Sequence, residues 1–296
     1  MSRHPIPLRA LALLPVLALM WGTSWPLFAF AVQEVSGWTF RAVACVLAGG
    51  LLLLAARLRG LPLAIPRRWW PTVAAAACVY LALWNVATVY AAVLIPSGQA
   101  AVLGFTMPLW AALLAWLVLG ERPGRRMALA IAFGALAVAL LMVPGWHAYA
   151  RAPLGFGLGL LAGIGWAAGT LILKQGQVRV PALVLTGWQL LIAAVPTAAG
   201  ALLLGDGHWF VPSWASVLAI GWIALGPMGV GNVAWFALVG LVPVNVAALA
   251  SILVPIVAMI SGAIVHGEPL GPLQWAAMLS CVAGLSLTLL PARRGG

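Results

Sequence analysis

The amino-acid sequence predicts an all-α polytopic membrane protein with ten transmembrane helices, arranged as two inverted five-helix repeats. Three observations carry this prediction: the composition, the length of the apolar runs and an internal repeat. Of the 296 residues, 65% are hydrophobic and 6% are charged, whereas soluble proteins are about 45–50% apolar and about 25% charged. The apolar runs of about 20 residues suit α-helices that cross the hydrocarbon core of a bilayer.

The spans are separated at charges, prolines and glycine turns. The first run, which follows Arg9, is too long for the apolar core of a signal peptide and is interpreted as a retained span. Continuous runs also argue against a barrel, whose strands are shorter and alternate in hydrophobicity. Short joints, such as residues 33–35 and 240–243, make neighbouring helices antiparallel. The predicted spans cover residues 10–32, 36–56, 70–93, 98–119, 127–144, 154–173, 182–204, 214–239, 244–265 and 273–290.

Positive charge gathers in alternate joints. The formal net charge is +11, and short cytoplasmic loops of membrane proteins are enriched in Lys and Arg. With the N-terminus inside, the outer loops hold only Arg151, so we expect a multi-pass protein of the bacterial inner membrane with cytoplasmic N- and C-termini. The excess charge then needs no nucleic-acid partner. The inner segments hold Arg3, Arg9, Arg57, Arg59, Arg67, Arg68, Arg122, Arg125, Arg126, Lys174, Arg179, Arg293 and Arg294.

An internal repeat relates the two halves of the chain. The stretch NVATVYAAVLIPSGQAA from Asn85 resembles NVAWFALVGLVPVNVAA from Asn232, and the same register aligns Pro108 with Pro255. We therefore predict two domains, residues 1–148 with the first five spans and residues 149–296 with the second five. An odd number of spans turns the second copy upside down, as in transporters that alternate access around a midplane site.

Several short motifs add to this pattern. They are WGTSW from Trp21, the Gly-Glu blocks GERPGRR and GEPLGPL, and GIGWAAGT around Trp166. With the ten spans and the duplication, they resemble the EamA-type members of the drug/metabolite transporter superfamily. Within that group the chain is most similar to bacterial exporters of aromatic amino acids and related metabolites. The resemblance implies a transporter of small molecules.

The first span carries the most distinctive candidates for a substrate pathway. Trp21, Ser24, Trp25 and Phe28 share one helical face, and Pro26 predicts a kink in the turn of residues 22–24. This face could also pack against a neighbouring helix or belong to an interfacial aromatic belt, although its position near mid-span disfavours the belt.

The sixth span is the inverted counterpart of the first. Trp166 is its candidate cavity residue, and Gly163, Gly165 and Gly169 allow close helix packing or bending. A packing seam with one large side chain is the alternative. Prolines Pro26, Pro108 and Pro255 are further candidates for hinge or packing roles.

Polar and aromatic residues of other spans complete the predicted site. Buried amides in a membrane either bridge helices or meet a substrate, and the equivalent repeat positions of Asn85 and Asn232 favour bridging. The other candidates for substrate contact are Tyr80, Trp84, Thr88, Gln99, Trp188, Gln189 and Trp235.

Two basic residues stand apart from the loops. Arg41 lies about two turns inside the outer end of its span, where it could snorkel to the surface, so a structural or gating role is favoured over substrate contact. Lys174 closes the sixth span and is interpreted as a cytoplasmic anchor.

The residue types that are missing from the spans argue against several classes of function. No Asp or Glu lies inside a span, which disfavours proton-coupled export of cationic drugs. The Gly-Thr-Ser step superficially resembles that of a serine protease, but no His lies at midplane depth to act as its base, and no HExxH motif for a metal occurs. We therefore expect no catalytic residues, no metal and no cofactor.

These features predict a carrier that exports small neutral or zwitterionic metabolites, foremost aromatic amino acids, by alternating access. Aromatic faces would hold an apolar side chain, and the charged ends of the substrate would meet Ser, Asn, Gln and backbone groups rather than fixed ion pairs. Transport would be facilitated diffusion or exchange. The expected partners are the substrate and the lipid bilayer, with the protein a monomer or weak dimer. A broad-specificity drug/metabolite exporter and a nonenzymatic membrane scaffold are the alternatives.

Overall fold

The computed structural model describes residues 8–95, 97–120, 122–143, 146–205, 212–242, 247, 251, 253–266 and 270–289. Within these ranges the chain is helical and contains no strand. The predicted orientation of the two termini concerns residues outside these ranges.

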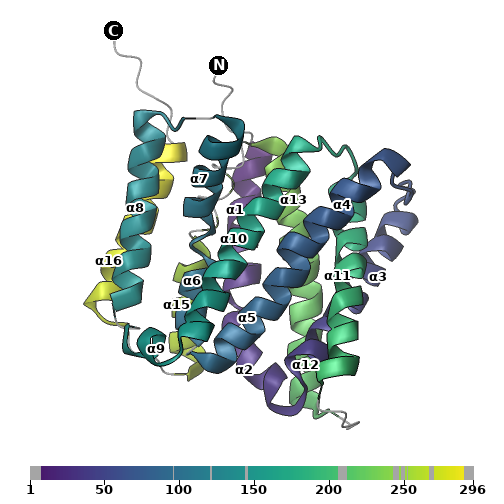
Figure 1. Ribbon diagram of the computed structural model, residues 1–296, viewed down its shortest axis with the longest axis horizontal. Coiled ribbons are helices and arrows are strands. Elements are labelled where there is room, and N and C mark those ends of the chain that lie inside the picture. The colour runs from purple at the N-terminus through teal and green to yellow at the C-terminus, as the bar shows by residue number, and fades with distance from the viewer. Residues whose placement is uncertain are drawn as a thin grey trace.

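The first half of the chain forms the helices from α1 to α8 (Figure 1). The helices are α1 (Leu8–Gly22), α2 (Trp25–Glu34), α3 (Gly37–Leu58), the short 3₁₀ helix η1 (Arg67–Trp69), α4 (Trp70–Ala76), the π-helix η2 (Ala77–Ala82), α5 (Leu83–Leu94), α6 (Ser97–Gly104), α7 (Met107–Leu119) and α8 (Arg125–Met142).

The second half continues from a short connecting helix. Its elements are α9 (Trp146–Arg151), α10 (Pro153–Gln175), α11 (Ala182–Leu204), α12 (Trp214–Ile223), the π-helix η4 (Ala224–Gly231), α13 (Asn232–Leu241), α15 (Leu253–His266) and α16 (Pro272–Leu289).

Seven helical runs in the described part of the chain are long and apolar enough to cross a membrane. They agree with predicted spans two to eight. The first predicted span is divided between α1 and α2, the ninth lies partly outside the described residues, and the tenth coincides with α16. The protein is therefore helical and polytopic, while the count of ten spans stays a prediction.

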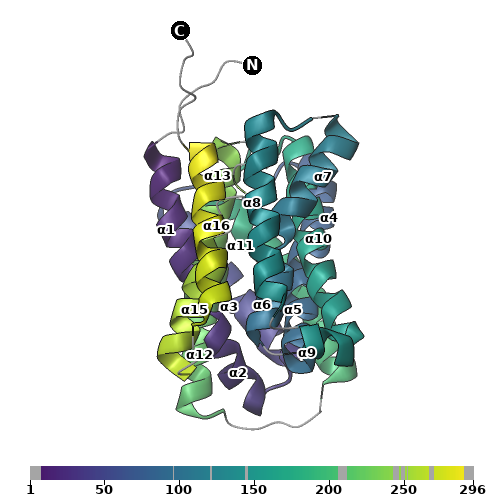
Figure 2. The same ribbon diagram turned by 90° about the vertical axis from the view of Figure 1, so that its left-hand side faces the viewer.

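Helices from the two halves pack against each other in pairs. The most extensive contacts join α3 to α11 and α8 to α16; α10 packs on α5 and α7, and α1 packs on α13 and α15. Helices α1 and α10 run in opposite directions, and α8 lies beside α16 (Figures 1 and 2).

Two predicted spans are interrupted close to prolines. Helix α1 ends at Gly22 and α2 begins at Trp25, at the turn where Pro26 predicts a kink. The hydroxyl of Ser24 donates to the carbonyl oxygen of Trp21 at 2.6 Å, which satisfies a carbonyl at this break. Likewise, α6 ends at Gly104 and α7 begins with Met107 and Pro108.

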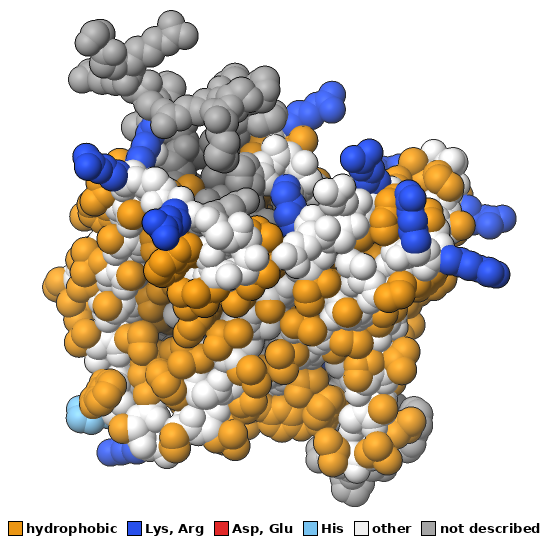
Figure 3. Space-filling view, turned by 45° about the horizontal axis from the view of Figure 1, so that its top comes forward, with side chains coloured by type: hydrophobic (Ala, Val, Ile, Leu, Met, Phe, Trp, Pro, Cys, Tyr) orange, Lys and Arg blue, Asp and Glu red, His pale blue; other side chains and the backbone are white. Residues whose placement is uncertain are grey.

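The outer surface of the bundle matches a membrane protein with one basic end. Apolar side chains such as Leu129, Leu202 and Leu279 are exposed on its sides, where lipid would surround them. Figure 3 shows Lys and Arg side chains gathered towards one end of the visible face, above a largely hydrophobic side.

Candidate functional site

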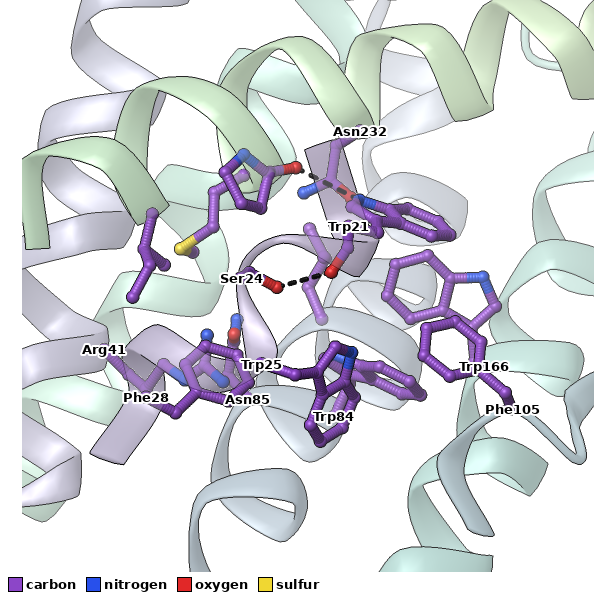
Figure 4. Close-up of a pocket in the computed structure, with 14 residues that line it drawn as sticks. Trp21, Ser24, Trp25, Phe28, Arg41, Trp84, Asn85, Phe105, Trp166 and Asn232 are labelled. Carbon is purple, nitrogen blue, oxygen red and sulfur yellow. Dashed lines mark hydrogen bonds between the residues drawn. The ribbon is translucent and has the colours of Figure 1, made fainter. Parts of the chain in front are cut away.

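A cavity lies among helices of both halves, near the break between α1 and α2 (Figure 4). The space open to the centre of a water-sized sphere is about 40 Å³, and a water molecule needs roughly 10–15 Å³ of such space. The cavity therefore has room for only a few water molecules in this conformation. Its lining consists of Trp21, Ser24, Trp25, Phe28, Arg41, Leu81, Trp84, Asn85, Phe105, Trp166, Ile223, Pro227, Met228 and Asn232.

Trp21 connects the first span to the π-helix η4. Its indole Nε1 donates to the carbonyl oxygen of Pro227 at 3.1 Å, and the backbone N–H of Asn232 is directed at the same oxygen. π-Helical turns are rare and often occur at functional sites. The wide turn of η4 thus presents a carbonyl that fixes the Trp21 ring at the cavity wall.

Trp166 is the centre of a cluster of aromatic rings. Its ring centroid lies 5.0 Å from that of Trp21, 5.2 Å from Tyr80, 4.8 Å from Trp84 and 5.9 Å from Trp235. All four contacts are edge-on, the geometry that the ring quadrupoles favour. We call these five residues the ring cluster; it forms one wall of the cavity and extends behind it.

Glycines of α10 bring Trp166 into this cluster. A Cβ atom at Gly163 would lie 2.9 Å from the Thr106 hydroxyl oxygen, and one at Gly165 would lie 2.7 Å from the Val79 carbonyl oxygen. A Cβ at Gly169 would overlap the side chain of Tyr80. Because these positions lack side chains, α10 lies directly against η2 and the break before α7.

A polar corner lies opposite the rings. Arg41 on α3 donates from Nη2 to the hydroxyl oxygen of Thr88 at 3.3 Å, and Asn85 donates from Nδ2 to the sulfur of Cys45 at 3.6 Å. In Figure 4, Arg41, Asn85 and Phe28 lie on one side of the cavity, and Trp166 and Phe105 lie on the other. The guanidinium of Arg41 and the amide of Asn85 thus lie on the side away from Trp166, whereas Asn232 lies beside Trp21.

Arg41 does not snorkel, contrary to the alternative considered from the sequence. Its side chain is 2% exposed, and its guanidinium carbon lies 4.5 Å from the ring centroid of Phe28 and 4.9 Å from that of Phe40. From its position in the sequence, the Arg41 side chain was expected to be able to reach the surface of the membrane; in the structure it is enclosed by these two rings and the cavity. Arg41 is therefore a buried cavity residue.

Other predicted site residues lie outside the cavity lining. Tyr80 donates its hydroxyl to Gln189 Oε1 at 2.7 Å, and both side chains are fully buried. Trp188 donates to the carbonyl oxygen of Leu63 at 2.8 Å, away from the cavity. Trp235 is buried behind Trp21 and Trp166. Of Gln99 and Pro26 the structure describes only the helical backbone.

Lys174 holds the end of a helix of the same half. Its Nζ donates to the carbonyl oxygens of Val239 at 3.1 Å and Val242 at 3.4 Å. A cation at this position stabilises a helix C-terminus. Pro108 and Pro255 occupy the first turns of α7 and α15 and are buried.

A polar contact joins the two halves at the end where α2 and α12 meet (Figure 1). The carboxylate of Glu34 accepts a hydrogen bond from the backbone N–H of Ser213 at 2.8 Å. This bond lowers the pKa of Glu34, because it favours the charged form. Ser213 is also the N-cap of α12.

The sequence reasoning missed several lining residues. Phe105 enters the cavity because the chain breaks between α6 and α7, and the nearby Pro108 was the available signal. Pro227 and Met228 line it from η4, whose wider turn leaves no simple pattern in the sequence. Among the described residues, no group of three His, Cys, Asp or Glu side chains is placed to hold a metal.

Comparison with known proteins places these features in a family. Residues 8–143 and 153–290 each match the EamA-like transporter family. The uncharacterized transporter YvbV of Bacillus subtilis is 26% identical over 94% of this chain and 88% of its own. The uncharacterized inner membrane transporter YedA of Escherichia coli is 28% identical over 93% and 88%, respectively.

Two further matches bear on cargo and fold. A protein of Salmonella typhimurium described as a probable amino-acid metabolite efflux pump is 29% identical over 64% of each chain. A crystal structure with 20% sequence identity matches with a TM-score of 0.79 over 96% of this chain and 98% of its own, which shows a shared fold. Because the family match covers nearly the whole sequence, the chain belongs to the EamA-like transporter family.

Proposed function

We propose that this membrane transporter exports small metabolites, with neutral and aromatic amino acids as its main cargo. The observation that carries the proposal is the cavity between the two halves, which combines an aromatic wall with a few polar groups. Such a lining suits a small molecule with one apolar and one polar end. The amino-acid efflux name of the Salmonella relative supports the same cargo.

We further propose that the chain forms two inverted five-helix repeats, divided near residue 148. The packing supports this arrangement: α1 contacts α13 and α15 in the same way that α10 contacts α5 and α7. In addition, η2 precedes the helix that holds Asn85, and η4 precedes the helix that begins at Asn232. The two separate matches to one family agree with a duplication.

Alternating access would then move the ring cluster. The cavity of about 40 Å³ is too small for an aromatic amino acid, so Trp21, Trp84 and Trp166 have to separate before cargo enters. The break at Thr23 and Ser24 lies next to these rings and allows α1 and α2 to move separately. Because the described residues that line the cavity include no carboxylate, we propose facilitated diffusion or exchange without a proton-coupling acid.

The orientation follows from the charge of the loops. We propose that the protein resides in the bacterial inner membrane with its basic end and both termini in the cytoplasm. The YedA relative carries the description of an inner membrane transporter. We propose a monomer or a weak dimer.

Flux in proteoliposomes tests the function. Purified protein is reconstituted, and the efflux of radiolabelled tryptophan, phenylalanine, leucine and alanine is measured with and without a pH gradient. We expect saturable efflux that is fastest for the aromatic substrates and insensitive to the gradient. Equal flux of all four would favour broad metabolite export, and the absence of saturable flux would contradict the transport of amino acids.

A pair of tryptophan variants tests the site. Trp84→Ala removes a ring of the cavity wall and should reduce aromatic flux more than alanine flux. Trp275→Ala is the control, because Trp275 is 55% exposed on the outer side of α16. Equal effects of the two variants would argue against a cargo site at the ring cluster.

A further inference from the structure

Arg41 is a cation placed at the cavity without an anionic partner among the described residues. It lies in the second turn of α3, lines the cavity and is 2% exposed. Glu34 is the single acidic residue in the described ranges, and its carboxylate binds the backbone of Ser213. An ionised side chain inside a membrane protein is costly and usually serves a function.

The described residues accept hydrogen bonds from only part of the Arg41 guanidinium group. The group has five N–H donors. One hydrogen bond, the 3.3 Å contact from Nη2 to Thr88, joins it to a described residue, and the buried Nε has no partner. The rings of Phe28 and Phe40 give cation–π attraction at 4.5 and 4.9 Å. These contacts hold the cation in place but leave donors available.

We propose that Arg41 binds the carboxylate of the transported molecule, an inference that rests on the proposed export function. A planar guanidinium and a carboxylate form paired, charge-assisted hydrogen bonds, and a ligand carboxylate neutralises the buried charge. The aromatic part of the substrate then faces the ring cluster across the cavity (Figure 4). This assignment replaces the expectation that no fixed ion pair meets the cargo.

The charge of the lining also defines the substrate class. The other polar side chains of the described lining, Ser24, Asn85 and Asn232, are neutral, so no described lining residue supplies a counter-charge for a substrate ammonium. The site therefore selects small monocarboxylates with an apolar or aromatic side chain, and an amino group is accepted rather than required. Amino acids and the corresponding deaminated acids belong to this class; amines and amides do not.

A ligand series with wild-type protein tests the selection without any substitution. Phenylalanine, 3-phenylpropionate, phenylalaninamide and phenethylamine share a ring but differ in carboxylate and amine. Binding is measured in detergent from the ligand-induced shift of the melting temperature. We expect both carboxylates to bind and the amide and amine to bind at least about 10-fold more weakly, as expected for a lost charge-assisted contact. Comparable binding of the amide or the amine would overturn the proposal.

Variants of two arginines separate binding from stability. Arg41→Gln should raise the KM for phenylalanine by about 10- to 100-fold, with a smaller change in kcat, and Arg41→Lys should fall between. Arg68→Gln is the control. The guanidinium carbon of Arg68 likewise lies 4.5 Å from an aromatic ring centroid, that of Trp69, but Arg68 is exposed on η1. An Arg41 that only joins helices would change the melting temperature and leave the KM unaltered.

The outcomes for the two proposals differ. Transport of phenylalanine with an unchanged KM in Arg41→Gln refutes the carboxylate site and leaves the export function intact. Wild-type protein that binds carboxylates selectively but transports none of them refutes the export of amino acids and leaves the carboxylate site intact. If Arg41→Gln does not fold, the ligand series with wild-type protein still tests whether the cavity selects carboxylates.

Discussion

The hydrogen bond between Tyr80 and Gln189 offers a direct test of how the cavity wall is held. It joins η2 to α11 over 2.7 Å, and neither side chain is exposed. Tyr80→Phe would leave Oε1 of Gln189 without a partner, and its Nε2 already has none. Gln189→Leu would in turn leave the Tyr80 hydroxyl unpaired. Each single change should therefore cost about 1–3 kcal/mol, the usual penalty for an unsatisfied buried polar group.

The double variant distinguishes this bond from simple packing. Replacing both partners by apolar groups of similar shape is nearly neutral, so Tyr80→Phe with Gln189→Leu should be more stable than either single variant. Melting temperatures in detergent, followed by tryptophan fluorescence, provide the measurement. For a chain of this size we expect single-variant losses of about 2–6 °C, using roughly 2 °C per kcal/mol.

A matched control is available on the neighbouring helix. Tyr90 is half-buried on α5 and lies against Trp38 with ring centroids 5.8 Å apart; its replacement by Phe should leave the melting temperature nearly unchanged. If the two losses at Tyr80 and Gln189 simply add in the double variant, the two residues are not coupled and the reasoning fails.

Three further predictions concern the scaffold. Gly169→Ala should destabilise the protein by about 1–3 kcal/mol, because the new methyl group would overlap η2. The control Gly157→Ala should be neutral or slightly stabilising, because a Cβ atom there meets nothing within 4 Å. Equal melting temperatures of the two variants would contradict the overlap at Gly169. Hydrogen bonding to Ser213 lowers the pKa of Glu34 from 4.5. The ionised Glu34 therefore stabilises the folded protein above pH 4.5, and this contribution disappears as the pH falls through the lowered pKa. Melting temperatures measured against pH should show this loss in acid for the wild type and not for Glu34→Gln. Lys174→Met should lower stability by about 1 kcal/mol and Lys174→Arg by less, and a Met variant as stable as wild type would exclude the capping role.

The aromatic wall could be predicted from the sequence because it depends on local periodicity. The sequence spacing predicts Trp21 and Trp25 on one face of the first span, and Trp166 in the span that the proposed repeat pairs with it; the break between α1 and α2 leaves both tryptophans at the cavity. All three line the cavity. The helix break before Trp25 was equally predictable, since Pro26 cannot donate a backbone hydrogen bond.

The remainder of the site depends on contacts between distant segments. The depth of Arg41 in its span was visible, and Phe40 directly precedes it in the sequence. The Phe28 ring that also covers Arg41 comes from α2, which packs on α3. Trp188 was expected near the substrate, but it donates to the carbonyl oxygen of Leu63, in the segment between α3 and η1, and so lies away from the cavity. The two π-helices escape prediction because one wider turn changes neither composition nor hydrophobicity.

The spacing within the ring cluster has an optical consequence. Indole rings whose centroids lie between 4.8 and 5.9 Å apart, as those of Trp21, Trp84 and Trp235 do from Trp166, are close enough for their electronic transitions to couple. The circular dichroism of the strong far-ultraviolet indole transition should therefore change when these rings separate, and a Trp166→Phe variant identifies their share of the signal among the 16 tryptophans. Opening of the cavity can thus be followed in the unlabelled protein, without knowing its cargo.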